Sequence, residues 1–291
     1  APEPVDEVAR ELVRQEAAAG DDASMRMLLA AESTGALIAE ELLHVGLPWS
    51  ASEHDRLLRE ALGPRPVAGR PARLQELAEE VDAHLGQHVS IDSAPELLRA
   101  LRAAGLDVHS TSRWELREVA HPVVAPLIEY KRLYRLWTAN GWQWADEWVQ
   151  GGRFHAEYVP AGVVTGRWAT AGGGAMQIAK QVRGAVVADA GWRLVVADAA
   201  QLEPRVLAAM ARDEALAEAA VGDLYAGLVD DGVVESRPRA KVAMLGALYG
   251  ATSGDSGRLV PNLRRAYPRA MRVVDEAAAT GERGGLVRTW L

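Results

Sequence analysis

Apolar side chains recur at helical spacing through the first half of the chain. Residues 5–45 follow this pattern, most clearly over 26–44, where Gly46 and Pro48 end it. The same spacing predicts four further helices, over 51–62, 72–85, 97–104 and 123–137. Ser50 or Ser52 is positioned to cap the first of these, and Ser93 with Glu96 has the spacing of a capping box before the third.

The pattern changes after residue 150. Short apolar runs over 153–159 and 163–168, with a Pro-Ala-Gly turn between them, predict two paired strands, and the glycine-rich 170–174 predicts a flexible crossing. Residues 194–197, Leu-Val-Val-Ala, predict a buried strand that ends at Asp198. Helical spacing resumes at Gln201, with Pro204 in the first turn, where its missing N–H costs little.

These elements predict an α+β fold that is predominantly helical, with a small antiparallel sheet carrying Asp198. The expected segments are an acidic helical lead-in over 1–24, a helical region over 25–150, a mixed piece over 151–210 and a second helical region over 211–291. Four tryptophans lie close together in the second segment, and we interpret them as core residues rather than base-stacking ones: Trp137, Trp142, Trp144 and Trp148.

Composition narrows the class of protein. The chain of 291 residues contains no cysteine, which excludes disulfides and thiolate metal sites and is typical of a cytoplasmic protein. No apolar run is long enough for a membrane span. The net charge is −8, yet residues 237–272 hold eight Lys or Arg against one acidic side chain. Such a cluster suits either phosphate binding or a solvated helix face.

Two stretches carry candidate chemistry. Asp198 follows the expected strand, where a carboxylate either faces a cleft or caps the next helix, and the pattern leaves both open. In the second stretch Arg237, Lys241, Leu245 and Tyr249 are four residues apart and therefore share one helix face. Two cations followed by an aromatic ring suit a nucleoside triphosphate, although an ordinary amphipathic helix explains the spacing equally well.

Taken together, these motifs resemble those of family A DNA polymerases. Residues 198–205, Asp-Ala-Ala-Gln-Leu-Glu-Pro-Arg, resemble the family's first polymerase motif, and residues 237–250 resemble its fingers-helix motif. The Thr-Gly-Arg at 165–167 matches the triplet that precedes both, and 129–131 resembles a thumb motif. The sequences of these motifs are most similar to those of the actinobacterial bifunctional 3′-5′ exonuclease/DNA polymerase branch. The resemblance implies thumb, partial palm and fingers of a right-hand polymerase.

The resemblance also implies roles for single residues. Asp198 would be the catalytic metal ligand for Mg²⁺, with two ions expected in the complete enzyme, and Lys241 would protonate pyrophosphate. The residues implied for the incoming dNTP are Arg237, Lys241, Tyr249, Glu203 (as steric gate), Gln201, Tyr225, Leu245 and Arg183, the last contacting either nucleotide phosphates or the template. The residues implied for primer–template DNA are Arg167, Thr165, Gln177 and Gly250.

The chain also departs from the family's pattern. Leu245 replaces an aromatic that stacks on the incoming sugar and base, and Tyr225 replaces a histidine that touches the triphosphate. The third motif, His-Asp-Glu, with its second metal-binding carboxylate, does not occur in the sequence, and neither does the Asp-x-Glu of the exonuclease. Gly254–Gly257 matches a serine-protease motif, but a helical region without a triad histidine excludes that reading.

The expected function is therefore DNA-directed DNA synthesis, in which a dNTP is added to a primer 3′-hydroxyl. The sequence is expected to be a fragment that is inactive alone, because one carboxylate holds two divalent ions poorly. The alternative is a non-catalytic DNA- or nucleotide-binding module derived from this family. A monomer in the cytoplasm, associated with the nucleoid and without a membrane partner, is expected in either case.

Overall fold

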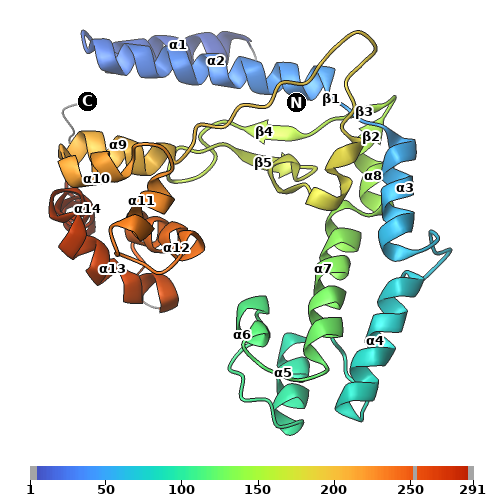
Figure 1. The fold of residues 1–291 in the computed structure, drawn as a ribbon. Helices are drawn as coiled ribbons and strands as arrows, with labels where there is room; N and C mark the ends of the chain where they lie inside the picture. The colour runs from blue at the N-terminus through green and yellow to red at the C-terminus, as the bar shows by residue number, and fades with distance from the viewer. Residues whose placement is uncertain (1–4, 252–253, 288–291) are drawn as a thin grey trace. The chain divides into compact units, whose positions relative to one another are not determined.

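The chain forms two compact units in a computed structural model that describes residues 5–251 and 254–287. Unit 1 is Ala1–Leu194 and unit 2 is Val195–Leu291. Helices dominate both units, and the strands are few and short (Figure 1). The predicted α+β class with predominant helix is confirmed. The first predicted segment, 1–24, and the last, 211–291, each include four terminal residues, 1–4 and 288–291, that lie outside the described residues.

Unit 1 is built on eight helices within its described part. They are α1 Val5–Ala19, α2 Ala23–Val45, α3 Ala51–Leu62, α4 Ala72–Leu85, α5 Ala94–Ala103, α6 Arg113–Arg117, α7 Val124–Asn140 and α8 Trp142–Trp148. The predicted helices are confirmed to within a few residues, and Ser50 caps α3 by accepting the Glu53 N–H at 3.2 Å. The helical character predicted over 5–45 is confirmed as two helices, and the Asp22 carboxylate caps the second by accepting the amides of residues 24 and 25.

The predicted capping box at Ser93 is wrong. Ser93 occupies the cap position of α5, but its side chain makes no capping hydrogen bond. The Glu96 carboxylate instead accepts the Ser90 N–H at 3.0 Å. The glutamate therefore closes the preceding turn, an alternative that the local sequence spacing does not distinguish from a capping box.

An aromatic cluster forms the centre of the unit 1 core. Trp49 and Trp144 each lie 4.9–5.6 Å, centroid to centroid, from one another and from the rings of His54 and Phe154. Trp142 and Trp144 are buried, while Trp137 and Trp148 pack partly buried against the same core, which confirms the core interpretation of the tryptophans. Helix α7 packs on α3, α4 and α8 and so joins this core to the rest of the unit (Figure 1).

Two small antiparallel sheets adjoin this core. One has the order β1–β3–β2, from Leu47–Pro48, Arg153–Phe154 and Val149–Gln150, and the other pairs β4 Glu157–Val159 with β5 Ala169–Gly172. The second predicted strand was misplaced, because residues 163–168 form the turn that precedes β5. Two short 3-10 helices follow, η1 Ala175–Gln177 and η2 Lys180–Ala185.

The glycines at 172 and 173 do not form the flexible crossing that their composition predicts. Gly172 ends β5, and the Gly173 carbonyl accepts the Trp144 indole N–H at 2.8 Å. A Cβ atom at Gly173, where φ is +69°, would lie 2.8 Å from the Phe154 ring. These glycines therefore allow the backbone to approach the aromatic cluster closely, as only a residue without a side chain can.

The predicted buried strand over 194–197 is also wrong. Leu194, Val195 and Val196 are 49%, 89% and 93% exposed, and no strand among the described residues pairs with them. Neither sheet carries Asp198. An apolar β-branched run becomes a buried strand only where neighbouring strands supply hydrogen bonds and side chains cover its faces, and the described residues supply neither.

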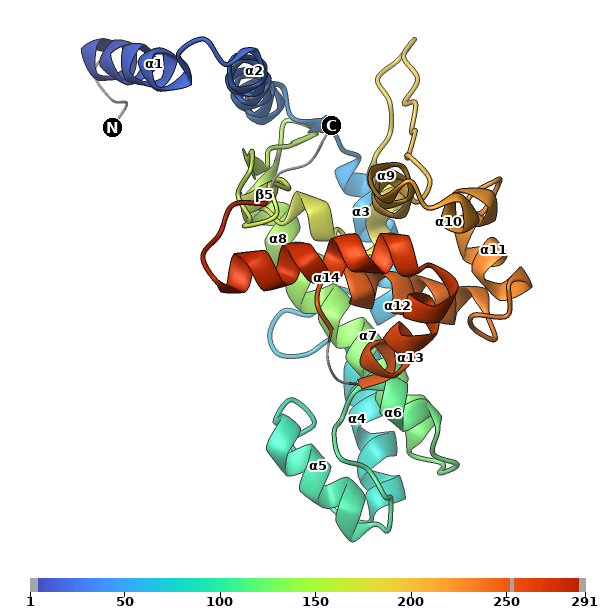
Figure 2. The ribbon, with the colours of Figure 1, turned by 90° about the vertical axis from the view of Figure 1, so that its left-hand side faces the viewer.

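Helices are the regular secondary structure of unit 2 where it is described. Its helices are α9 Leu202–Ala211, α10 Glu214–Ala219, α11 Leu224–Asp230, α12 Arg237–Leu248, α13 Gly254–Ala266 and α14 Pro268–Glu282. Helix α14 packs on α9, α12 and α13 (Figure 2). The buried Asp213 carboxylate caps α10 and also accepts the Ala270 N–H of α14 at 2.9 Å. No helix of the described residues has the length and apolar character to cross a membrane.

The histidine of the unit 1 core generates a pH prediction. His54 Nδ1 accepts the Trp49 indole N–H at 3.3 Å, and Nε2 donates to the Asn140 carbonyl at 2.9 Å. Burial lowers the pKa of His54 below its ordinary 6.5. The neutral ring is therefore favoured in the folded state, and its stabilisation is complete above pH 6.5 and is lost as the pH falls below that value. We expect the Tm of the wild type to drop between pH 7.5 and 5.0 by more than that of His54→Gln; equal slopes for both proteins would contradict this role.

Candidate functional site

Helix α12 presents an exposed cationic face. Arg237 and Lys241 are exposed, Leu245 is half-buried, and Tyr249, which follows the last helical residue, is 51% exposed. A neighbouring face, which includes Ala240, Ala243, Met244 and Ala247, is buried in the unit 2 core. Burial of this second face fixes the rotation of the helix about its axis, and the four predicted residues consequently lie on the solvent side.

The far end of α12 is tied to α9. The Tyr249 hydroxyl donates to Glu203 Oε1 at 2.8 Å, across 46 residues of sequence. Glu203 stands in the first turn of α9, and Gly250 follows Tyr249 with a φ of +72°, which lets the chain turn away at once. The two predicted motifs are therefore brought into direct contact within one unit.

The near end of α12 is held by an acidic residue. Arg237 donates to Asp223 Oδ2 from Nε at 2.8 Å and from Nη2 at 2.7 Å. Its guanidinium also lies 5.5 Å from the ring centroid of the buried Tyr225. Hydrogen bonding to Arg237 holds the pKa of Asp223 below its ordinary value, so the carboxylate is charged at neutral pH.

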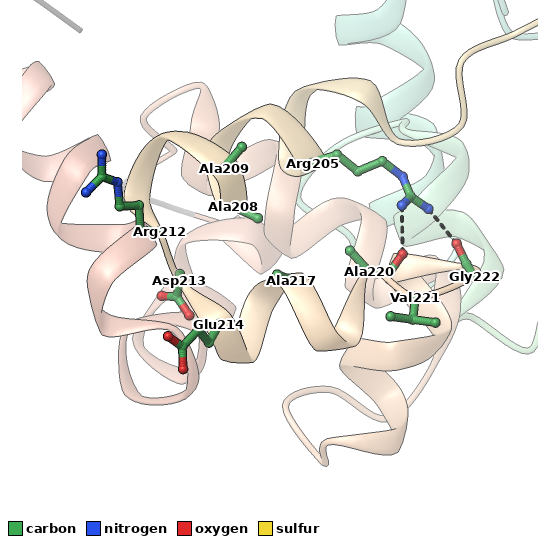
Figure 3. Close-up of a pocket in the computed structure, with 10 residues that line it drawn as sticks. All are labelled: Arg205, Ala208, Ala209, Arg212, Asp213, Glu214, Ala217, Ala220, Val221 and Gly222. Atoms are coloured by element: carbon green, nitrogen blue, oxygen red, sulfur yellow. Dashed lines mark hydrogen bonds between the residues drawn. The ribbon is translucent and has the colours of Figure 1, made fainter. Parts of the chain in front are cut away.

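Arg205 links these contacts to α9 (Figure 3). Its guanidinium donates to the carbonyls of Ala220 at 2.7 Å and Gly222 at 2.5 Å, and its Nε donates to the Ala200 carbonyl at 2.9 Å. It also donates to the Gln201 side chain at 3.2 Å. Gln201 and Arg205 therefore brace the turn that leads to Asp223, and the shallow groove of about 670 Å³ beside them is floored by alanines of α9 and α10.

Asp198 lies apart from this network. It is exposed, belongs to no helix or strand, and stands four residues before α9, whose cap position is occupied by Gln201. The geometry thus removes the reading of Asp198 as the cap of that helix. The described residues contain no group of three or more His, Cys, Asp or Glu side chains that could hold a metal ion. A single exposed carboxylate does not fit a pair of Mg²⁺ ions.

Unit 1 carries a separate basic groove of about 430 Å³. Its polar lining comes from α6, α7 and the two 3-10 helices, and includes Arg113, Lys131, Arg132, Arg135, Gln177 and Gln181. Lys131 is committed to the structure, since its ammonium donates to the Thr111 carbonyl and hydroxyl. Arg132 pairs with Glu129, whereas the Arg113 and Arg135 side chains have no partner among the described residues.

The thumb-like motif at 129–131 is structural in this chain. Tyr130 is buried and donates to Asp92 at 2.8 Å, and Arg70 pairs with the same carboxylate. Glu129 holds Arg132, and Lys131 holds the loop before α6. Tyr130 and Lys131 therefore attach α7 to other segments, the Glu129–Arg132 pair lies within the helix, and the next turn presents Arg135 to solvent.

The remaining predicted residues lie elsewhere in unit 1. Thr165 and Arg167 are exposed in the turn between β4 and β5, and the Arg167 carbonyl accepts the Val163 N–H at 3.3 Å. Arg183 is exposed in η2, and its Nε donates to the Ile178 carbonyl at 3.1 Å. The structure groups Gln177 with the basic groove, and it groups Gln201, Glu203, Tyr225, Arg237, Lys241, Leu245, Tyr249 and Gly250 on unit 2.

Comparison with known proteins decides the family. The family model described as DNA polymerase family A matches residues 70–264, well over half of the chain. This chain belongs to DNA polymerase family A. The expected resemblance is therefore confirmed, and the matched region runs from α4 to within α13.

Relatives of the chain are longer than it is. DNA polymerase I of Chloroflexus aurantiacus is 27% identical over 263 residues, which cover 81% of this chain and 27% of that protein. The thermostable DNA polymerase I of Thermus thermophilus is 26% identical over 75% of this chain and 31% of its own length. The matched region thus spans less than a third of each of these relatives.

A solved structure has the same fold. It is the POL domain of Pol1 from M. smegmatis in complex with DNA primer–template and dNTP, with a TM-score of 0.66 and 20% identity. The match covers 84% of this chain and 49% of that one. The family A polymerase fold is therefore established for this chain.

Two residues of the unit 2 network were not identified from the sequence as site residues. Asp223 follows a glycine at the start of α11, a position that predicts only a helix cap, and it does cap α11. Arg205 belongs to the quoted first motif, but nothing in the sequence shows that its donors reach the carbonyls of 220 and 222. Both roles depend on contacts across turns.

We expect Arg205→Met to open the α9–α10 hairpin. The substitution keeps a long apolar side chain and removes four hydrogen bonds, and charged hydrogen bonds contribute roughly 1.5–3 kcal/mol each where they are shielded. For a partly buried side chain we expect a total loss of about 2 kcal/mol, which corresponds to amide exchange in α10 faster by roughly thirtyfold. Hydrogen exchange measures this. Arg239→Met, which loses only an exposed pair with Glu235, is the control, and unchanged α10 protection in Arg205→Met would contradict the bracing role.

Proposed function

We propose that this chain is the nucleotide- and DNA-binding portion of a DNA-directed DNA polymerase, which adds a dNTP to a primer 3′-hydroxyl. The observation that carries the proposal is the contact between the two motifs. Tyr249 at the end of α12 bonds Glu203 of α9, while Arg237 and Lys241 lie on the exposed face of the same helix. Membership of a DNA polymerase family supports the general function.

The cationic face suits a triphosphate. Arg237 and Lys241 are one helical turn apart, about 6 Å along the helix axis, so two long cationic side chains can reach different phosphates of one triphosphate. Lys241 has no partner among the described residues and is available as a point charge. In the proposed reaction Lys241 also delivers a proton to the leaving pyrophosphate, and Tyr225 and Leu245 complete the nucleotide surface.

Glu203 and Tyr249 suit discrimination of the sugar. Their hydrogen bond holds the carboxylate beside the aromatic ring, where it would exclude a ribose 2′-hydroxyl. Tyr249 would pack beside the nascent base pair, and Gln201 and Gly250 would support this corner. Leu245 offers an apolar but not a stacking surface to the incoming sugar and base.

Unit 1 suits the duplex. Its basic groove brings Gln177 together with Arg113 and Arg135, whose charges are not neutralised within the described residues. We assign this groove to phosphates of primer–template DNA, with Thr165 and Arg167 reading the primer end and Arg183 contacting nucleotide phosphates or template. In these terms 25–150 is the thumb, 151–210 part of the palm and 211–291 the fingers, after the acidic lead-in. We propose a monomer that acts on chromosomal DNA in the cytoplasm.

The metal chemistry is incomplete in the described residues. Polymerases of this family use divalent ions, and Asp198 is the candidate ligand, but the described residues contain no group of three or more metal-ligating side chains that could hold such an ion. The alternative function, a DNA- or nucleotide-binding module without turnover, is favoured by this one observation. The proposal for this chain alone is therefore limited to binding and positioning.

Primer extension tests whether this chain turns over without a complete metal site. We expect the 291-residue chain to bind a primer–template duplex and to add no nucleotide with either Mg²⁺ or Mn²⁺, because one carboxylate holds two divalent ions poorly. Extension is followed on a denaturing gel, with a complete family A polymerase as the positive control. Extension that is abolished by Asp198→Ala would show that the missing carboxylate is not required.

The salt dependence of duplex binding tests the groove. We expect Arg135→Ala to weaken primer–template binding and to reduce the slope of log K against log salt by about 0.9, which is the value for one lost phosphate contact. Fluorescence anisotropy at roughly 50 to 200 mM salt measures the slope, because the affinity for DNA changes strongly over this range of salt concentration. Arg99→Ala, on the distal helix α5, is the control; an unchanged slope in Arg135→Ala would remove the groove from the DNA path.

A further inference from the structure

The Asp223 carboxylate divides its two oxygens between two helices. Oδ1 accepts the backbone N–H groups of Tyr225 and Ala226 at 3.0 and 3.1 Å, which caps α11. Oδ2 accepts both hydrogen bonds from Arg237, at the start of α12. The carboxylate is thus anchored by the backbone of α11 and keeps its position whether or not Arg237 is bound to it.

The Arg237 guanidinium, unlike the Asp223 carboxylate, is not held in position by backbone hydrogen bonds within the described residues. The Arg237 side chain is 53% exposed and reaches Asp223 on a long flexible stem, with the Tyr225 ring beneath the guanidinium. An exposed ion pair of this kind is weak and exchanges readily with other anions. Lys241, one turn further along α12, has no such counter-charge among the described residues. One of the two phosphate-binding cations is therefore neutralised within the fold and the other is not.

Carboxylate and phosphate oxygens compete for the same guanidinium donors, because both accept paired hydrogen bonds from Arg. We infer that Asp223 is an internal counter-ion that occupies Arg237 in the nucleotide-free fingers, and that the triphosphate must displace it. Asp223 thereby lowers the affinity for the triphosphate and sets how readily α12 releases pyrophosphate. This inference rests on the proposed nucleotide-binding role of α12 and adds the residue that regulates it.

The opposite possibility is a positioning role. If Asp223 instead orients Arg237 toward the phosphates, removing its charge weakens binding. Asp223→Asn separates the two, since asparagine is as good a helix cap as aspartate and keeps the Oδ1 acceptor for α11. Only the charge that faces Arg237 is lost.

The experiment measures binding of inorganic tripolyphosphate to the full chain by isothermal titration calorimetry at low salt. We expect Asp223→Asn to bind about two- to fivefold more tightly than the wild type, the range expected for release of one exposed ion pair. The gain must disappear in the Asp223→Asn/Arg237→Ala double variant, since the guanidinium is then absent. Unchanged or weaker binding by Asp223→Asn overturns the inference.

Glu235→Gln is the matched control. It removes the same charge and frees Arg239, on a different face of α12, from an i,i+4 pair at 3.0 Å. We expect no gain, and an equal gain in Glu235→Gln would attribute the effect to net charge and overturn the inference. Lys241→Ala tests the proposed function itself. If the wild type binds and Lys241→Ala does not, while Asp223→Asn shows no gain, only the counter-ion role is wrong. If neither wild type nor Asp223→Asn binds tripolyphosphate, the nucleotide-binding role of α12 fails as well.

Discussion

The attachment of α12 at both ends, to α9 through Tyr249 and to the cap residue of α11 through Arg237, is the constraint on which the candidate site depends. At one end the Tyr249 hydroxyl donates a hydrogen bond to the Glu203 carboxylate. At the other end Arg237 donates to Asp223. The residue before Asp223 is Gly222, whose carbonyl accepts a hydrogen bond from Arg205. Between these contacts the small residues of α12 are buried in the core of unit 2. Packing fixes the rotation of the helix and the polar contacts fix its ends, so the exposed cations keep one orientation toward solvent.

Unit 1 relies on a comparable arrangement around the end of α7. The Asn140 carbonyl accepts a hydrogen bond from the buried His54 ring, and its side-chain oxygen accepts the Ala179 N–H at 2.9 Å. One residue therefore joins the aromatic core to the segment that carries Gln177 and Arg183. Because buried polar groups without partners are costly, this junction is specific, and it places Gln177 beside the cations of α7.

The exposed cations of the chain differ in how completely they are neutralised. Surface arginines such as Arg56, Arg59 and Arg132 are paired with carboxylates on their own helices. Arg113 and Arg135 in the basic groove and Lys241 on α12 lack such partners among the described residues. In a chain of net charge −8, positive charge left unpaired at these places gives local attraction for phosphates that the overall charge does not reveal.

The sequence by itself determined most helices, because helical spacing, caps and glycine stops are local signals. It also determined the family, since motifs of fixed residue types and spacing can be recognised without knowing which residues are in contact. It determined the strands only in part: 153–159 contains β3 and β4, whereas Leu194–Val196 has the composition of a buried strand but no partner strand among the described residues. The same holds for the site. The α12 face follows from spacing, whereas the Asp223–Arg237 pair, the Arg205 brace and the grouping of Gln177 with Arg135 join residues that are 14 to 42 positions apart, and only tertiary packing brings such residues together.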